Sequence, residues 1–277
     1  MRALLLAATL LTPAAAFAGE PVRLATLLPY VQDAIARVGG CEVVAAVRRS
    51  MAEAPAAPII DLGSPHGPSY ERLAEARPQL VVGDKQMHSA VRERLERSGA
   101  EVLLVESDSV EGTFAGLIEV GRRCGVADGM TAQVDAVRRS LGEEALKKPT
   151  PILLLFGTPG SFLVVSNRTW LGDLARQLSF ENLGAASAGQ EQHPGYVQVS
   201  DEALASLRPA AILMVAHGDP EAIRSAFARR LDAGGPWAGM RSDATVGVHV
   251  LPAALFSQNP GLGMADAARN LHGLASP

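Results

Sequence analysis

Short apolar runs alternate with amphipathic stretches along most of this chain. Four runs in the first half are rich in Val, Leu and Ala and predict short β-strands: 22–28, 42–47, 79–84 and 101–107. Residues 30–38 and 89–99 lie between such runs, show helical spacing and end at glycines, so each predicts a helix. Strands that alternate with helices predict a parallel sheet covered on both faces. Residues 19–122 are therefore predicted to form an N-terminal α/β lobe.

A longer amphipathic stretch follows this lobe. Its apolar residues recur at helical spacing, with no Gly or Pro between them: Met130, Val134, Val137 and Leu141. This predicts one connecting helix within residues 123–148, ended by Pro149. Residues 149–277 repeat the alternation and predict a C-terminal α/β lobe. The fold class is thus α/β, with two Rossmann-like lobes, central mainly parallel sheets and a single long α-helix between them, which limits lobe motion more than a flexible linker would.

The composition indicates a folded protein and excludes some functions. Hydrophobic residues make up 48% of the 277 residues and charged residues 19%, which is ample for a core. A net charge of -4 argues against nucleic-acid binding, which needs a basic face. No nucleophile elbow, His-Glu-x-x-His pair or Walker loop occurs in the sequence, so we do not expect an enzyme.

The first 18 residues predict a cleaved signal peptide. One Arg precedes an apolar run that ends in the small-x-small motif Ala16-Phe17-Ala18. The run is too short to span a bilayer, and no later stretch approaches the roughly 20 apolar residues that a spanning helix needs. No Cys lies at the cleavage site, so a lipid anchor is not expected. We expect a monomer in the periplasm.

The chain has two cysteines, Cys41 and Cys124. An oxidising compartment allows them to form a disulfide. Two buried small hydrophobic residues are an equally good interpretation, because the sequence does not show whether their Cα atoms come within about 7 Å. Both interpretations stay open at this point.

One unit of sequence occurs twice, once in each predicted lobe. Glu-x-Leu-Ala-x-x-Arg-Pro begins at Glu71 and again at Glu202, and each copy leads into an apolar segment that ends in Gly-Asp. A glutamate at a helix start is also favoured by the helix dipole, by about 0.3–1 kcal/mol. The duplication itself favours two lobes.

Several segments together carry a resemblance to a known family. They are RLATLLPYVQDAIARVG, GPSYERLAEARPQLVV, the long middle helix, GSFLVVSNRTWLGDLARQLSFENLG, GYVQVSDEALASLRPAAILMVAHG and VHVLPAALFSQNPG. The chain thereby resembles the periplasmic binding proteins whose lobes are joined by a rigid helix and which serve ABC importers of haem, ferric siderophores and cobalamin. It departs from that family at residues 27–30, Leu-Leu-Pro-Tyr, where the family usually has Ser-Leu-x-Pro-Ser.

The resemblance implies partners and a transported ligand. In the family, an acidic residue at a helix start of each lobe docks on arginines of the membrane permease, and the matching positions here are Glu71 and Glu202. The implied partners are an ABC permease and its ATPase. The resemblance implies no intrinsic cofactor, since haem would be bound as cargo.

Ligands of open α/β sheets bind beyond the carboxyl ends of the strands. Residues that follow predicted strands, or lie in the neighbouring loops, are Tyr30, His66, His88, His193 and His217. In the haem receptors of the family, segments similar to those around His66 and His217 carry the axial iron ligands, usually Met and His. We therefore expect His66 and His217 to hold haem iron, one from each lobe. Arg49 follows the second strand and is expected to pair with carboxylates of the ligand.

Other ligands remain open on sequence grounds. Ferric siderophores and cobalamin use the same family backbone, since fold does not determine ligand. Zinc is a third alternative, because several histidines could supply nitrogen ligands: His66, His88, His193 and His217. The last alternative is a sensor module that keeps the fold but has no permease as a partner.

Overall fold

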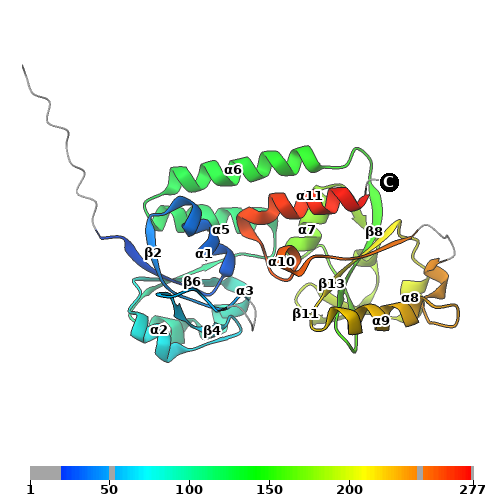
Figure 1. The fold of residues 1–277 in the computed structure, drawn as a ribbon, viewed down its shortest axis with the longest axis horizontal. Coiled ribbons are helices and arrows are strands. Elements are labelled where there is room, and N and C mark those ends of the chain that lie inside the picture. The colour runs from blue at the N-terminus through cyan, green and yellow to red at the C-terminus, as the bar shows by residue number, and fades with distance from the viewer. Residues whose placement is uncertain (1–19, 50–53, 242–245, 276–277) are drawn as a thin grey trace, which may run out of the picture.

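The computed structural model describes residues 20–49, 54–241 and 246–275, so the predicted signal peptide lies outside the described residues. Two α/β lobes lie side by side, and the helices α6 (Ala127–Glu144) and α11 (Met264–Ala275) run along one side of both (Figure 1). The predicted fold class is confirmed, while the exact domain boundaries stay a prediction. None of the helices within the described ranges is long and apolar enough to cross a membrane.

The N-terminal lobe contains a five-stranded sheet in which every neighbouring pair is parallel. In spatial order its strands are β3 (Ile60–Asp61), β2 (Cys41–Ala46), β1 (Val22–Thr26), β6 (Leu80–Asp84) and β7 (Glu101–Val105). Its helices are α1 (Pro29–Val38), α2 (Tyr70–Ala76), α3 (Lys85–His88), α4 (Arg92–Glu96) and α5 (Val110–Arg123). The helix expected over 89–99 is shorter than predicted, because a 3₁₀ turn over Ser89–Val91 precedes α4.

The C-terminal lobe contains a seven-stranded sheet that is only partly parallel. Its strands are β8 (Thr150–Gly157), β9 (Phe162–Val165), β10 (Phe180–Asn182), β11 (Gly189–His193), β12 (Tyr196–Val199), β13 (Ala211–Ala216) and β14 (Gly247–Val250). Its helices are α7 (Trp170–Gln177), α8 (Asp201–Ala205), α9 (Pro220–Leu231) and α10 (Ala253–Phe256). Strand β8 pairs in parallel with β10 and β13 but antiparallel with β9. The reason is the tight turn between β8 and β9, closed by the bond from Thr158 N–H to the Ser161 carbonyl (2.9 Å), which is too short for a crossover.

Helix α6 is the predicted connector, and it is one unbroken helix of 18 residues. The four apolar residues that predicted it are its buried residues, and they belong to the core shared with α5 and α11. The core therefore continues from one lobe into the other along this helix.

The chain crosses between the lobes a second time near its end. Residues 257–263 follow α10 of the C-terminal lobe and contact the N-terminal lobe. The side-chain amide of Asn259 donates to the Ser107 carbonyl (3.0 Å) and to the Thr113 hydroxyl (2.8 Å). Gly261 has φ +56°, and a Cβ there would come within 2.8 Å of Tyr30, so this position requires glycine. The lobes are thus held by a returning segment as well as by the predicted helix.

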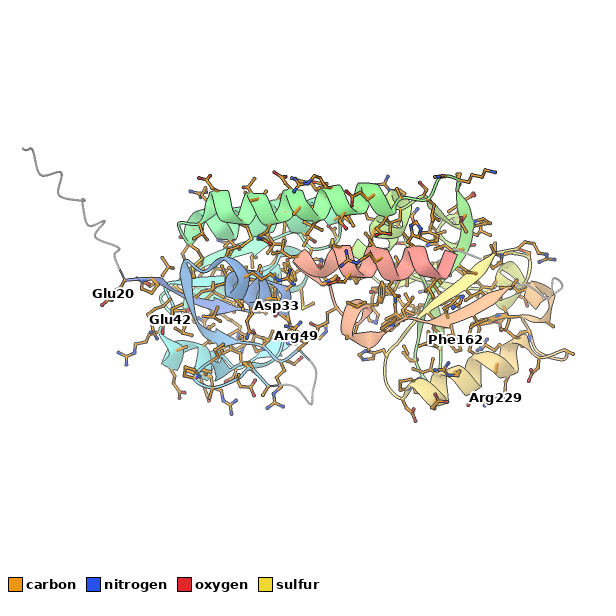
Figure 2. The ribbon with its side chains drawn as sticks, turned by 45° about the horizontal axis from the view of Figure 1, so that its top comes forward. Glu20, Asp33, Glu42, Arg49, Phe162 and Arg229 are labelled. Atoms are coloured by element: carbon orange, nitrogen blue, oxygen red, sulfur yellow. A yellow bond between two sulfur atoms is a disulfide. The ribbon has the colours of Figure 1, made fainter. Side chains whose placement is uncertain are left out.

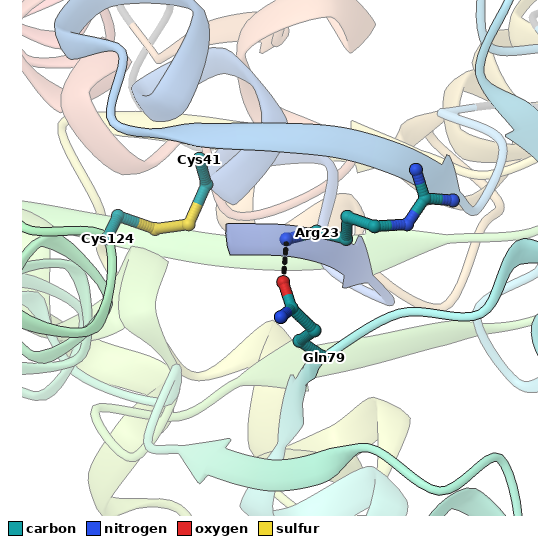
Figure 3. Close-up of a disulfide and its surroundings, with 4 residues drawn as sticks. All are labelled: Arg23, Cys41, Gln79 and Cys124. Atoms are coloured by element: carbon teal, nitrogen blue, oxygen red, sulfur yellow. Dashed lines mark hydrogen bonds between the residues drawn. A yellow bond between two sulfur atoms is a disulfide. The ribbon is translucent and has the colours of Figure 1, made fainter. Parts of the chain in front are cut away.

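A disulfide joins Cys41 at the start of β2 to Cys124 after α5, with their Cα atoms 5.0 Å apart (Figure 3). This settles the two interpretations that the sequence left open. Close by, the backbone N–H of Arg23 donates to the side-chain oxygen of Gln79 at 2.9 Å, which ties β1 to the residue before β6 (Figure 3). The bridge fastens the sheet to the helix that leads into α6.

Removing the disulfide is expected to destabilise the protein strongly. The bridge joins residues that are 83 positions apart, and a closed loop of that length restricts the unfolded chain by about 4 kcal/mol. The Cys41→Ser/Cys124→Ser protein should therefore lose about 4 kcal/mol of unfolding free energy, measured by urea denaturation. Reduced wild-type protein is the control and should show the same loss. Equal stability of the oxidised and reduced wild type would contradict the expectation.

Candidate ligand-binding site

His66 lies at the tip of a small hairpin of the N-terminal lobe. The hairpin pairs β4 (Gly63–Ser64) with β5 (Gly67–Pro68) in antiparallel fashion, and His66 is in the two-residue turn between them. Its backbone N–H contacts the Ser64 hydroxyl at 3.3 Å, and its side chain is exposed. Within the described ranges its ring nitrogens have no hydrogen-bonding partner, so both are available to a ligand.

His88 lies beneath this hairpin and is 1% exposed. Its Nδ1 accepts the backbone N–H of Asp84 at 2.9 Å, and its Nε2 is 2.9 Å from the Pro65 carbonyl. Because an N–H and a carbonyl face the two nitrogens, Nδ1 is bare, Nε2 carries the proton, and the imidazole is neutral. The predicted ligand contact at His88 is therefore replaced by a structural role, since both nitrogens are already used. His88 is the last residue of α3, and its bond to Pro65 holds the turn that contains His66 against this helix.

The His88→Ala substitution is expected to destabilise the protein by about 2–4 kcal/mol, because it opens a cavity and leaves buried polar groups of Asp84 and Pro65 without partners. It should also weaken ligand binding, since the turn carrying His66 loses its anchor. Urea denaturation measures the first effect. The control is His193→Ala, at an exposed position, which should stay within about 0.5 kcal/mol of wild type. A stable His88→Ala protein would refute the structural role.

His217 directly follows β13 in the C-terminal lobe and is exposed. Its backbone N–H donates to the Gly157 carbonyl at 2.8 Å, and its ring stacks on Phe156 with centroids 5.6 Å apart. Tyr196 meets the same Phe156 ring edge-on at 5.2 Å, and burial raises the pKa of its phenol. Among the residues that the structure describes, none is hydrogen-bonded to the His217 ring. An aromatic pair thus orients an imidazole whose nitrogens are available.

Tyr30 and His193 lie in different environments. Tyr30 is buried in α1, its hydroxyl shares a hydrogen bond of 2.9 Å with Ser107, and burial raises its pKa well above the usual range. We therefore assign Tyr30 to the core in place of the predicted ligand contact. His193 is exposed at the end of β11, opposite Tyr196 in the β11–β12 hairpin.

Arg49 lies at the side of the N-terminal lobe that faces the C-terminal lobe (Figure 2). Its guanidinium pairs with Asp33 at 2.5 Å, and both side chains are nearly half exposed. Its carbonyl accepts the side-chain amide of Gln258, from the returning segment, at 2.6 Å. An exposed ion pair of this kind contributes little to stability, so the guanidinium can exchange Asp33 for a ligand carboxylate.

Glu71 and Glu202 occupy equivalent places in α2 and α8. Each is exposed and is the second residue of its helix, and Ser69 or Ser200 caps that helix by accepting a backbone N–H. Both helices lie on the side of their lobes away from α6 and α11 (Figure 1). The repeated sequence thus encodes a capped helix that presents a carboxylate and then leads into a strand, β6 or β13.

Two surface hollows lie in the C-terminal lobe, apart from these histidines. One of about 500 Å³ is lined by residues around β10, and one of about 440 Å³ lies between Pro159 and Arg229. Within the described ranges no group of three or more His, Cys, Asp or Glu is placed to hold a metal ion. The sequence interpretation missed two residues, Phe156 and the exposed Met87 that follows β6. The strand-end rule, by which ligands bind beyond the carboxyl ends of strands, selected His217 and also applies to Met87.

Two α/β lobes bridged by a long helix, with exposed histidines at strand ends and turns of both, define a two-lobed solute-binding protein. Residues 37–241 match the family model described as periplasmic binding protein. The chain belongs to this periplasmic binding protein family.

Relatives of known structure share the whole fold. The High-affinity heme uptake system protein IsdE of Staphylococcus aureus is 23% identical over 184 residues, which cover 65% of this chain and 61% of IsdE, less than two thirds of that relative's length. The crystal structure of IsdE complexed with heme has a TM-score of 0.73 at 19% identity, covering 92% of this chain and 99% of IsdE.

Two further structures are similar. An ABC transporter substrate-binding protein from Listeria monocytogenes has a TM-score of 0.76 at 20% identity and covers 92% of this chain and 99% of its own. The structure of Staphylococcus aureus SirA complexed with staphyloferrin B has a TM-score of 0.72 at 15% identity. The match covers 92% of this chain and 93% of SirA. At these identities the likeness establishes the fold.

Proposed function

We propose that this protein is the solute-binding component of an ABC importer, which captures haem or a related iron chelate between its lobes and delivers it to a membrane permease. It acts by binding and catalyses no reaction, and it works in the periplasm after export. The observation that carries the proposal is the pair His66 and His217, one exposed on each lobe, each with ring nitrogens that have no hydrogen-bonding partner among the described residues.

Imidazole is a good ligand for haem iron, and one ligand from each lobe would hold the porphyrin by both faces. The protein orients one ring and holds the backbone of the other. His217 is oriented by its stack on Phe156, and the turn of His66 is fastened by His88. Such supporting contacts tune and orient a metal ligand. Arg49 would pair with a propionate, in exchange for Asp33.

Delivery requires recognition by the permease. We assign this role to Glu71 and Glu202, because they are exposed and occupy matching helices of the two lobes, α2 and α8, which lie on one side of the molecule (Figure 1). A two-fold permease with arginines at its surface would fit two carboxylates presented in this way.

A ferric siderophore is the second candidate cargo. Arg49 favours it, since an exposed guanidinium between the lobes suits the carboxylates of a chelate. SirA, which shares the fold, binds staphyloferrin B.

Titration of the purified protein with ferric haem, a ferric carboxylate siderophore, cobalamin and Zn²⁺ tests the proposal. We expect one haem per protein with a sharpened Soret band, and weaker binding of the other three. Tight binding of a siderophore, cobalamin or zinc with no change in the haem spectrum would replace haem as the cargo. Binding of none of the four would favour a sensor module.

A further inference from the structure

Met87 is unusually exposed for a large apolar residue. Among the described residues, Met87 and Val248 are the two large hydrophobic side chains with marked exposure, 42% in each case. Met87 lies on α3, directly after the carboxyl end of β6, where ligands of open α/β sheets bind. The exposed part of this apolar side chain would be stabilised if a ligand covered it.

The backbone of Met87 is nevertheless held firmly. Its N–H donates to the carboxylate of Asp84 at 2.7 Å, and the N–H of Asp84 donates to His88 at 2.9 Å. His88 in turn bonds the carbonyl of Pro65 at 2.9 Å. This partly buried hydrogen bond joins His88, the chain neighbour of Met87, to Pro65, the chain neighbour of His66. A shared network places Met87 and His66 on the same part of the lobe surface.

The thioether chemistry of Met87 suits one class of ligand. A methionine side chain is flexible and polarisable, and its sulfur contacts conjugated rings favourably. A hydrophilic chelate gains little from such a contact. The C-terminal lobe offers a matching surface, because His217 lies on the ring of Phe156.

We propose that Met87 packs against the conjugated macrocycle of the ligand and selects a flat apolar ring system over a hydrophilic iron chelate. It acts through the ring and not through the iron, which His66 and His217 hold. This inference rests on the proposed function and specifies which part of the ligand each residue recognises.

Haem and metal-free protoporphyrin, titrated by fluorescence quenching, separate these two kinds of contact. Met87→Gln is expected to weaken binding of both by about tenfold, because both lose the same apolar contact. Met87→Leu should bind both compounds more tightly than Met87→Gln, because it keeps the apolar contact and loses only the contact of the sulfur. His217→Ala should weaken haem more than protoporphyrin. Val248→Gln is the matched control, with equal exposure on β14, and should change neither affinity.

The titrations distinguish failure of this inference from failure of the proposed function. Loss of affinity for haem alone in Met87→Gln would make Met87 an iron ligand and overturn the inference, and unchanged affinity for both compounds would overturn it as well. A wild-type protein that binds haem but not protoporphyrin would overturn the inference and leave the proposed function intact. A wild-type protein that binds neither would overturn both.

Discussion

Reversing the charge of Glu71 and Glu202 together is expected to abolish transport and leave ligand affinity unchanged. In the Glu71→Arg/Glu202→Arg protein, each docking helix would present a cation to the arginines of the permease, so attraction becomes repulsion at both lobes. Fold and site should persist, because both residues are exposed and each reversal costs only the helix-dipole term of about 0.3–1 kcal/mol. Uptake into vesicles containing the permease and its ATPase measures transport.

The matched control is Glu143→Arg/Glu221→Arg, which reverses two exposed glutamates outside the repeated positions, one on α6 and one on α9. This control should transport normally. If the Glu71→Arg/Glu202→Arg protein also transports normally, docking through these glutamates is refuted. If the control fails equally, net charge and not position decides transport.

Removing the imidazole of His217 or His66 is expected to weaken haem binding by about 100-fold. Loss of even an outer-shell partner costs 10–100-fold in metal affinity, and these residues are proposed to touch the iron itself. The His249→Ala protein is the control, since that side chain lies within β14. Unchanged haem affinity in both the His66→Ala and the His217→Ala proteins would refute the proposed haem site.

Much of the fold follows from the pattern of apolar residues. The connecting helix was predictable because four apolar residues fall on one face, and those four are the ones buried. The parallel sheet of the N-terminal lobe was predictable because strands and helices alternate in sequence. The C-terminal sheet departs from this rule where the turn over 158–161 forces β9 to pair antiparallel with β8, and that depends on a turn only four residues long.

The site was predictable only in part. The strand-end rule selects positions along the chain, but it does not give the direction of a side chain. Tyr30 and His88 satisfy the rule, yet both are buried with their polar atoms paired inside the protein. The returning segment at 257–263 was missed because its contacts with Ser107 and Thr113 join residues far apart in sequence, which no local pattern records.

Electron paramagnetic resonance of the protein loaded with ferric haem tests the central claim most directly, because the spin state of ferric iron reports its axial ligands. If His66 and His217 hold the iron from the two lobes, the wild-type complex gives a low-spin signal of bis-imidazole type. That signal is lost in both His66→Ala and His217→Ala and retained in His249→Ala. A high-spin wild-type complex, or a low-spin signal that survives both substitutions, would contradict the claim.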